Sequence, residues 1–177
     1  MSIANQIEYW VRNGTLIPIE PTLPSGLIIR RLYATPDVNR LISGPWRDTQ
    51  EEIRCGRLRQ DFDRFIERRP ISLAIDDPYK KDKTAYLARL SPSADEVWEI
   101  RSRDPKPAIR VFGRFAICDT FIAFNWGYRK DLGGPGSKEF RFEINRAKSE
   151  WRKIFPTYRP VSGADIHDYV SEECFPA

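Results

Sequence analysis

The spacing of apolar residues and the positions of capping residues predict four helices. They are expected over residues 2–13, 35–44, 49–69 and 137–155. The last one shows the clearest pattern, because its apolar side chains recur at the spacing of a single helix face. These side chains are Phe140, Ile144, Ala147, Trp151 and Ile154. We expect this face to be buried.

Between the third and fourth expected helices the hydrophobic period changes to two. Strands are expected at residues 71–75, 84–90, 97–103, 108–116 and 120–125, and residues 27–33 are also β-like. Short links with turn residues, such as Asp-Pro-Lys-Pro, favour antiparallel pairing. The expected fold class is therefore α+β, with an antiparallel sheet of about four to five strands packed against helices.

The length of 177 residues fits one domain. We expect an N-terminal extension over residues 1–45, an α+β body over 46–160 and an acidic C-terminal tail over 161–177. Hydrophobic residues make up 41% and charged residues 31% of the chain, values that argue against wholesale disorder.

Few residues are available for metal or thiol chemistry. The chain has one histidine, His167, and three widely spaced cysteines, Cys55, Cys118 and Cys174. The cysteines are far apart and lack the CxxC spacing typical of a structural zinc site, so no metal and no cofactor is expected. The odd cysteine number, the lack of a signal-like N-terminus and the lack of a long apolar run predict a cytoplasmic protein with reduced thiols and no membrane contact.

Basic and acidic side chains are unevenly distributed along the chain. Residues 97–130 hold seven basic and three acidic side chains, whereas residues 161–177 hold four acidic side chains and no lysine or arginine. Strand alternation places four arginines on one solvent-facing side of two neighbouring strands. They are Arg101, Arg103, Arg110 and Arg114. Such a cluster suits phosphate groups. The alternative is that these arginines form ion pairs with Glu99, Asp104 and Asp119.

Four short segments resemble RelE/HigB-type toxins, in particular the phage-derived RelE-like group. Residues 97–101 (VWEIR) resemble the xxELR strand of the family, and residues 109–111 (IRV) resemble the next strand. Residues 124–130 (FNWGYRK) and 143–147 (EINRA) resemble the following strand end and helix. The resemblance covers about residues 95–150. It implies a RelE-like C-terminal half that binds RNA or the ribosome and that an antitoxin-like protein neutralises.

The resemblance also implies roles for particular residues. It assigns catalytic roles in metal-independent RNA cleavage to Arg101, Arg110, Tyr128, Arg129 and Lys130. In such a reaction the ribose 2′-hydroxyl is the nucleophile, so the protein mainly positions the substrate and stabilises charge. Strand geometry adds Arg103 and Arg114 as nucleic-acid contacts, and Trp126 is a candidate for stacking on a base.

Two further alternatives concern function and the tail. A non-catalytic interaction or structural module with a charged sheet face is the alternative to a toxin-type protein. The acidic residues of 161–177 are candidates to fold over the arginines and mask them. Alternatively, the tail packs through its apolar residues Ile166, Tyr169, Val170 and Phe175.

Overall fold

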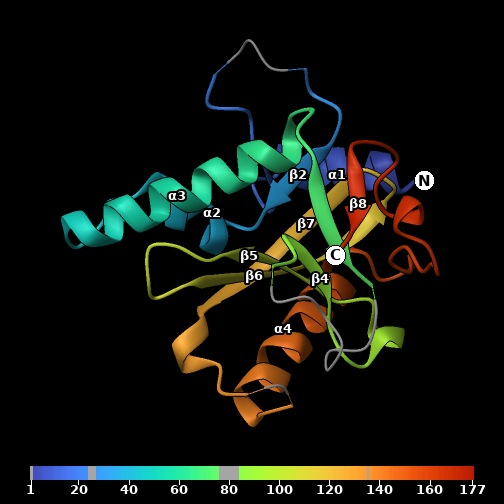
Figure 1. The fold of residues 1–177 in the computed structure, drawn as a ribbon. Coiled ribbons are helices and arrows are strands. Elements are labelled where there is room, and N and C mark those ends of the chain that lie inside the picture. Colours follow the sequence, from blue (N-terminus) through green and yellow to red (C-terminus); the bar gives the residue numbers. More distant parts are fainter. Residues whose placement is uncertain (1, 24–26, 76–83, 135) are drawn as a thin grey trace.

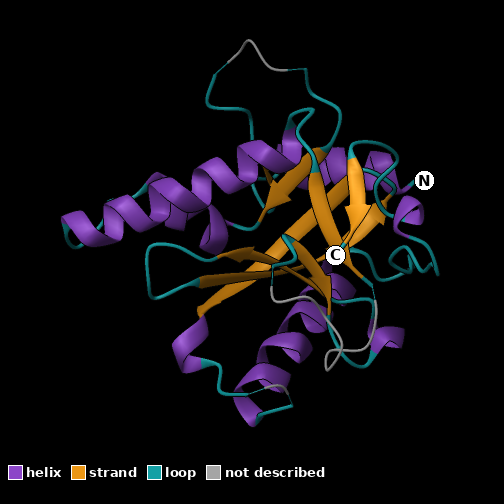
Figure 2. Cartoon of the chain, in the orientation of Figure 1, coloured by secondary structure: helices purple, strands orange, loops and turns teal. Residues whose placement is uncertain are grey.

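A computed structural model describes residues 2–23, 27–75, 84–134 and 136–177. These residues form an α+β fold built on one eight-stranded sheet, with helices on both of its faces (Figures 1 and 2). The sheet mixes parallel and antiparallel pairs. The expectation of four to five antiparallel strands was therefore wrong.

The strands lie in the spatial order β1-β2-β7-β6-β5-β4-β3-β8. Their bounds are β1 (Ile17–Pro18), β2 (Arg31–Ala34), β3 (Ile71–Ala74), β4 (Leu87–Arg89), β5 (Trp98–Ser102), β6 (Ile109–Ile117), β7 (Thr120–Tyr128) and β8 (Cys174–Pro176). The consecutive strands β4, β5, β6 and β7 pair antiparallel, as their short links predict.

Parallel pairing joins strands whose partners the local patterns did not reveal. β2 runs parallel to β7, β4 runs parallel to β3, and β3 runs parallel to β8. The first and last of these pairs join segments about ninety or more residues apart, so no turn marks them in the sequence. Residues expected to form an extension and a tail thereby contribute β2 and β8 to the sheet.

The helices divide into two layers. They are α1 (Ile3–Arg12), α2 (Pro36–Ser43), α3 (Thr49–Ile66) and α4 (Lys138–Ile154), with short 3-10 turns η1 (Ser93–Asp95), η2 (Arg129–Asp131) and η3 (Ile166–Asp168). α2 and α3 cover one face of the sheet in a core that includes Phe62 and Trp98. α4 and α1 share the core of the opposite face, which includes Phe112 and Trp151. We call these the α3 face and the α4 face.

The sequence predicts that one side of the sheet is open to solvent. This expectation was wrong, because α4 and α1 cover that side. The apolar stripe of α4 is buried, as expected, but it lies against the side of β6 that carries Phe112. The rings of Phe112 and Phe140 lie 5.7 Å apart, edge to face. Both long helices have an apolar face, and a sheet that is apolar on both sides buries both of them.

The ends of the helices follow local capping chemistry. The Asp48 side chain accepts a hydrogen bond from the backbone of Glu51 and starts α3, and Ser137 caps α4 in the same way. α3 ends at Ile66, three residues before the expected end. There the buried Arg30 side chain donates to the carbonyl groups of Glu67 and Arg69, so these residues leave the helical path.

Candidate anion-binding site

A cavity of about 430 Å³ lies where α3 passes the ends of β4 and β5. Its charged side chains come mainly from two elements: Arg57, Asp61 and Arg64 from α3, and Arg101 and Arg103 from β5 and the residue after it. We call this cavity the arginine pocket. It holds two of the arginines that the sequence predicts for nucleic-acid contact and three residues that the sequence analysis missed.

The helix spacing explains the contribution of α3. Arg57, Asp61 and Arg64 stand four and three residues apart, so they share one face of the helix. Arg64 is held in place because its Nε and Nη2 donate to the Pro70 carbonyl group at 3.0 and 2.7 Å. Its guanidinium also lies 5.4 Å from the centre of the Tyr86 ring. This part of the pocket wall is therefore built before any ligand binds.

Asp61 is a buried acid within this basic wall. Its residue surface is 7% exposed, and Arg57 Nε lies 3.8 Å from its Oδ1. Burial raises the pKa of the Asp61 carboxyl, against the opposing effects of a Ser102 hydrogen bond and of Arg57, Arg64 and Arg103. The Tyr86 hydroxyl donates to the Asp61 backbone carbonyl at 2.6 Å. The position of Asp61 between the apolar residues Leu58 and Phe62 is the signal by which sequence reasoning could have found this site.

Next to the pocket, two arginines share one carboxylate. Arg101 and Arg110 are direct partners across β5 and β6. Arg101 Nε lies 2.8 Å from Glu99 Oε1, and Arg110 Nε lies 3.5 Å from Glu99 Oε2. Glu99 is only 2% exposed. The expected convergence of Arg101 and Arg110 is present, and so is the pairing with Glu99 that the alternative interpretation predicts.

Positive charge accumulates around Arg110. Burial lowers the pKa of the Arg110 guanidinium, Glu99 opposes this, and Arg101, Arg129 and Arg103 lower the pKa further by repulsion. Like charges that depress each other's pKa are close in space. Arg101, Arg103, Arg110 and Arg129 therefore form one electrostatic cluster, to which Lys130 adds an exposed charge in η2.

Tyr128 and Trp126 lie on the other side of the sheet. In the β6–β7 register Tyr128 is paired with Ile109 and Trp126 with Val111, and both of these partners belong to the core of the α3 face. The Arg54 guanidinium from α3 lies 5.5 Å from the centre of the Tyr128 ring. Alternation along β6 puts Arg110 on the α4 face, so the structure does not bring Tyr128 or Trp126 together with Arg110.

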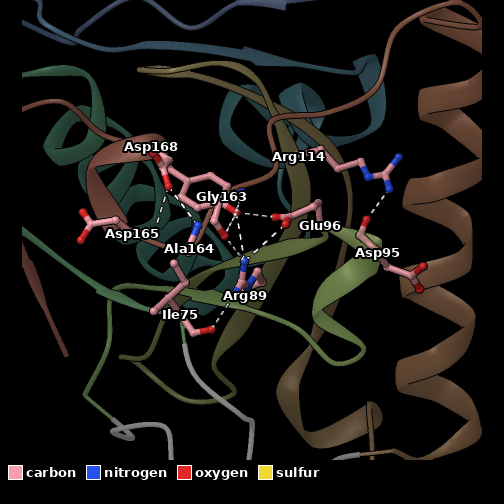
Figure 3. Close-up of polar contacts among 10 residues, drawn as sticks. Ile75, Arg89, Asp95, Glu96, Arg114, Gly163, Ala164, Asp165 and Asp168 are labelled. Carbon is pink, nitrogen blue, oxygen red and sulfur yellow. Dashed lines mark hydrogen bonds and ion pairs between the residues drawn. The ribbon is translucent and has the colours of Figure 1, made fainter.

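Arg114 is separated from the cluster as well. It shares the α4 face with Arg110, but Phe112 and the helix above it lie between them. Its guanidinium lies 5.5 Å from the centre of the Trp151 ring and donates to the Asp95 carbonyl group (Figure 3). Burial lowers the pKa of Arg114 to about 10. Arg114 therefore stabilises the contact between β6 and α4, at the end of β6 away from Arg110.

The tail packs onto the sheet, and its last three residues, Phe175, Pro176 and Ala177, line the arginine pocket. Ile166, Tyr169 and Val170 are buried in the core of the α3 face. The Tyr169 hydroxyl donates to Glu96 at 2.7 Å, and Arg89 donates to the Gly163 carbonyl group at 2.9 Å (Figure 3). The acidic residues of the tail have other partners: Arg68 pairs with Glu172 and Glu173 at 3.2 Å each, and Asp165 and Asp168 cap η3.

Residues for metal or thiol chemistry are sparse in this structure. Within residues 2–23, 27–75, 84–134 and 136–177, no three His, Cys, Asp or Glu side chains are grouped to hold a metal ion. His167 Nδ1 lies 3.6 Å from Cys174 Sγ, whose pKa is raised, mainly by burial. A thiol with a raised pKa is a poor nucleophile. Among the described residues, the arginine pocket therefore has the densest grouping of charged side chains around a cavity.

Comparison of the chain with protein-family models, with curated proteins and with solved structures found no match. Among the helices of the described residues, none is long and apolar enough to cross a membrane. The geometry and charge of the arginine pocket are therefore the basis on which we infer a function.

Proposed function

We propose that this protein binds the phosphate backbone of a nucleic acid, with RNA as the first candidate, through the arginine pocket and the adjoining cluster. Six arginines support this proposal, namely Arg57, Arg64, Arg101, Arg103, Arg110 and Arg129. Among the described residues, three side-chain carboxylates accompany them: Asp61, Glu99 and Asp104. An excess of guanidinium groups around a cavity fits a multiply charged anion.

The observation that carries the proposal is the environment of Arg110. This guanidinium has lost much of its contact with water, has one carboxylate beside it and is repelled by three other arginines. Such an arrangement is electrostatically unfavourable unless an anion offsets it. Phosphate groups would relieve the repulsion, and the planar guanidinium fork matches their geometry.

A salt titration of RNA binding tests the proposal. With about five phosphate contacts, the plot of log affinity against log salt concentration should have a slope of about −3 to −4 for single-stranded RNA. The double variant Arg103→Gln, Arg110→Gln should weaken binding and make the slope shallower by about 1.4. The matched control is Arg12→Gln, Arg152→Gln, which removes the same charge at two exposed positions. Equal binding by both double variants, or binding that ignores salt, would refute the proposal.

A toxin-type ribonuclease is the more specific form of the proposal. The resemblance over residues 95–150 supports it, and this region contains the β5-β6-β7 meander followed by α4. Tyr128 is on the opposite face from Arg110, so a proton-transfer role for this residue at the cluster lacks geometric support. Arrest of bacterial growth on expression, relieved by Lys130→Ala, together with cleavage of labelled RNA, would favour the ribonuclease. Binding without cleavage would leave a non-enzymatic RNA-binding protein.

The second candidate is a structural or interaction module, for which the Glu99 contacts are the specific observation. Arg101 and Arg110 both lie within ion-pair distance of this carboxylate. In a module of this kind the three side chains stabilise the sheet and recognise no nucleic acid. The same titration separates the two candidates, because a module shows no affinity for RNA at low salt.

A further inference from the structure

The shape of the arginine pocket limits how an RNA strand can use it. The pocket is a cavity of about 430 Å³, and Arg110, the centre of the neighbouring cluster, is not among the residues that line it. A cavity of this size falls in the range of small-molecule sites, roughly 300–1,000 Å³. A strand that continues in both directions passes over such a cavity, whereas the end of a strand can enter it.

The charge of the pocket suits a doubly negative group. Four guanidinium groups and two carboxylates are among its lining side chains, namely Arg57, Arg64, Arg101, Arg103, Asp61 and Asp104. Asp104 lies at the exposed rim, where its Oδ1 is 3.7 Å from Lys106 Nζ. A phosphomonoester carries about two negative charges near neutral pH, whereas each internal phosphodiester carries one. The pocket therefore matches a terminal phosphate better than a phosphate in the middle of a chain.

The two arginines from α3 are held in position before a ligand binds. Arg64 is fixed by the Pro70 carbonyl group and lies beside the Tyr86 ring. Arg57 Nε lies 3.8 Å from Asp61 Oδ1, and Arg57 Nη1 donates to Gln60 Oε1 at 3.3 Å. A planar guanidinium oriented in this way offers its remaining N–H groups to phosphate oxygens. Asp61 thus helps to orient one of the groups that would contact a phosphate.

An aromatic ring lies at the same cavity. Phe175 in β8 lines the pocket and is 46% exposed. β8 lies beside β3 (Figure 1), and Phe175 is the register partner of Ser72. Register partners point to the same side of a sheet, and the Ser72 Oγ accepts from the Tyr86 backbone at 3.0 Å, where both residues line the cavity. The Phe175 ring is therefore available for stacking on an unpaired base.

We propose that the arginine pocket receives the phosphorylated end of a single-stranded RNA, with the terminal phosphomonoester among the guanidinium groups and the terminal base against Phe175. One terminal nucleotide presents both groups at once, because its phosphate and its base are joined through one ribose. This inference rests on the proposed function and divides it between two surfaces. The pocket binds the end of the strand, and the cluster around Arg110 binds the phosphates that follow.

Fluorescence anisotropy with oligoribonucleotides tests the proposal on the whole chain. The probes share one sequence of about eight nucleotides and an internal label, and they end in a 5′-phosphate, a 3′-phosphate or hydroxyl groups alone. One of the two phosphorylated strands should bind at least about tenfold more tightly than the hydroxyl-ended strand, and methylation of its terminal phosphate to a diester should remove most of this preference.

The outcomes separate this inference from the proposed function. Equal affinities for the phosphorylated and hydroxyl-ended strands would overturn the inference and leave RNA binding intact. A nucleoside monophosphate that binds as tightly as the phosphorylated strand would overturn the assignment to a strand end. Absence of binding by every strand would overturn the proposed function as well.

Two matched pairs of variants locate the strand end. Arg57→Gln should lower the preference for the phosphorylated strand by about three- to tenfold. Arg152→Gln removes the same charge from an exposed position on α4 and should leave the preference unchanged. The Arg57 side chain is 53% exposed, so folding is retained.

The second pair concerns the base. Phe175→Ala should weaken binding of the phosphorylated strand about fivefold or more, and should have no effect when the terminal nucleotide is abasic. Phe142→Ala, at another exposed ring that does not line the arginine pocket, should leave binding unchanged. Equal effects within either pair would show that the strand end does not bind in the arginine pocket.

Discussion

Arg101 and Arg110 face each other across β5 and β6, and both guanidinium groups contact the same buried carboxylate of Glu99. Like charges directly opposite on a sheet are destabilising. Glu99 compensates for one of the two positive charges, and the second charge is left to solvent, to neighbouring groups or to a ligand. This relationship connects the stability of the fold to the proposed anion-binding function.

Replacing Glu99 by glutamine should destabilise the protein strongly. The variant leaves two largely buried guanidinium groups without their shared carboxylate, and breaking a buried ion pair in this way costs about 3 kcal/mol of unfolding free energy. Urea denaturation measures the loss. Glu150→Gln is the control, because Glu150 pairs with Lys153 at an exposed position and should change stability by less than about 1 kcal/mol. Polyphosphate should recover more stability in Glu99→Gln than in the parent. A variant as stable as the parent would contradict the role of Glu99.

Asp61 should make stability fall as pH rises through the acidic range. Its pKa is raised in the folded state, mainly by burial, so the folded protein holds this proton more tightly than the unfolded chain. Stability then decreases from about pH 4, the ordinary carboxyl pKa, up to the raised folded pKa, and is constant above it. Asp61→Asn lacks this contribution. The difference in unfolding free energy between parent and variant, measured from pH 3 to 7, should therefore change in that range. A difference independent of pH would contradict the prediction.

Removing the Tyr169 hydroxyl should loosen the tail from the sheet. This hydroxyl donates to Glu96 at 2.7 Å and accepts from the Gly163 backbone at 2.8 Å, and Arg89 Nη1 lies 3.0 Å from it. Tyr169→Phe leaves buried polar groups without a partner, which costs about 1–3 kcal/mol. Tyr9→Phe is the control, because Tyr9 is 47% exposed. Urea denaturation compares the two variants.

Tyr169 also has a spectroscopic signature. Burial and the hydrogen bond to Glu96 raise the pKa of Tyr169 to about 12. In a difference titration of phenolate absorbance, the parent minus Tyr169→Phe signal should be absent at pH 10, the ordinary tyrosine value, and should grow as the pH approaches 12. A signal already half complete at pH 10 would show that the hydroxyl is not held in this network.

Two glycines should respond oppositely to alanine. A methyl group at Gly113 in β6 would collide with the Ile122 carbonyl oxygen and the Phe121 ring. Gly113→Ala should therefore destabilise the protein by about 1–3 kcal/mol. At Gly56, inside α3, a methyl group would meet no atom within 4 Å. Gly56→Ala should stabilise by about 0.5–1 kcal/mol, because alanine favours the helix. Thermal unfolding of both variants measures the contrast, and a shift of the same sign in both would contradict it.

Local elements were largely predictable because their causes are local. α1, α2, α3 and α4 begin where capping residues predict. β5 lies within its expected strand, β6 matches its expected strand to within one residue, and β7 begins at Thr120 as expected but continues to Tyr128, three residues further. The alternation on β5 and β6 also identified Arg101 and Arg103, which lie near Arg110, and Arg114, which lies apart from them. The pocket residues Arg57, Asp61 and Arg64 were missed, because their spacing on α3 has meaning only once that helix crosses the ends of β4 and β5.

The amino-acid sequence by itself determined the helices, the β5-β6-β7 meander and the concentration of basic charge between residues 97 and 130, since periodicity, caps and composition act over a few residues. Only the tertiary structure decided that β2 and β8 join the sheet and that both faces are covered. It also decided that Arg110 and Tyr128 lie on opposite faces. These properties depend on pairing between distant segments and on which helix covers which face. Strand pairing and helix placement are both set by the burial of the whole apolar surface, so no short stretch of sequence predicts them.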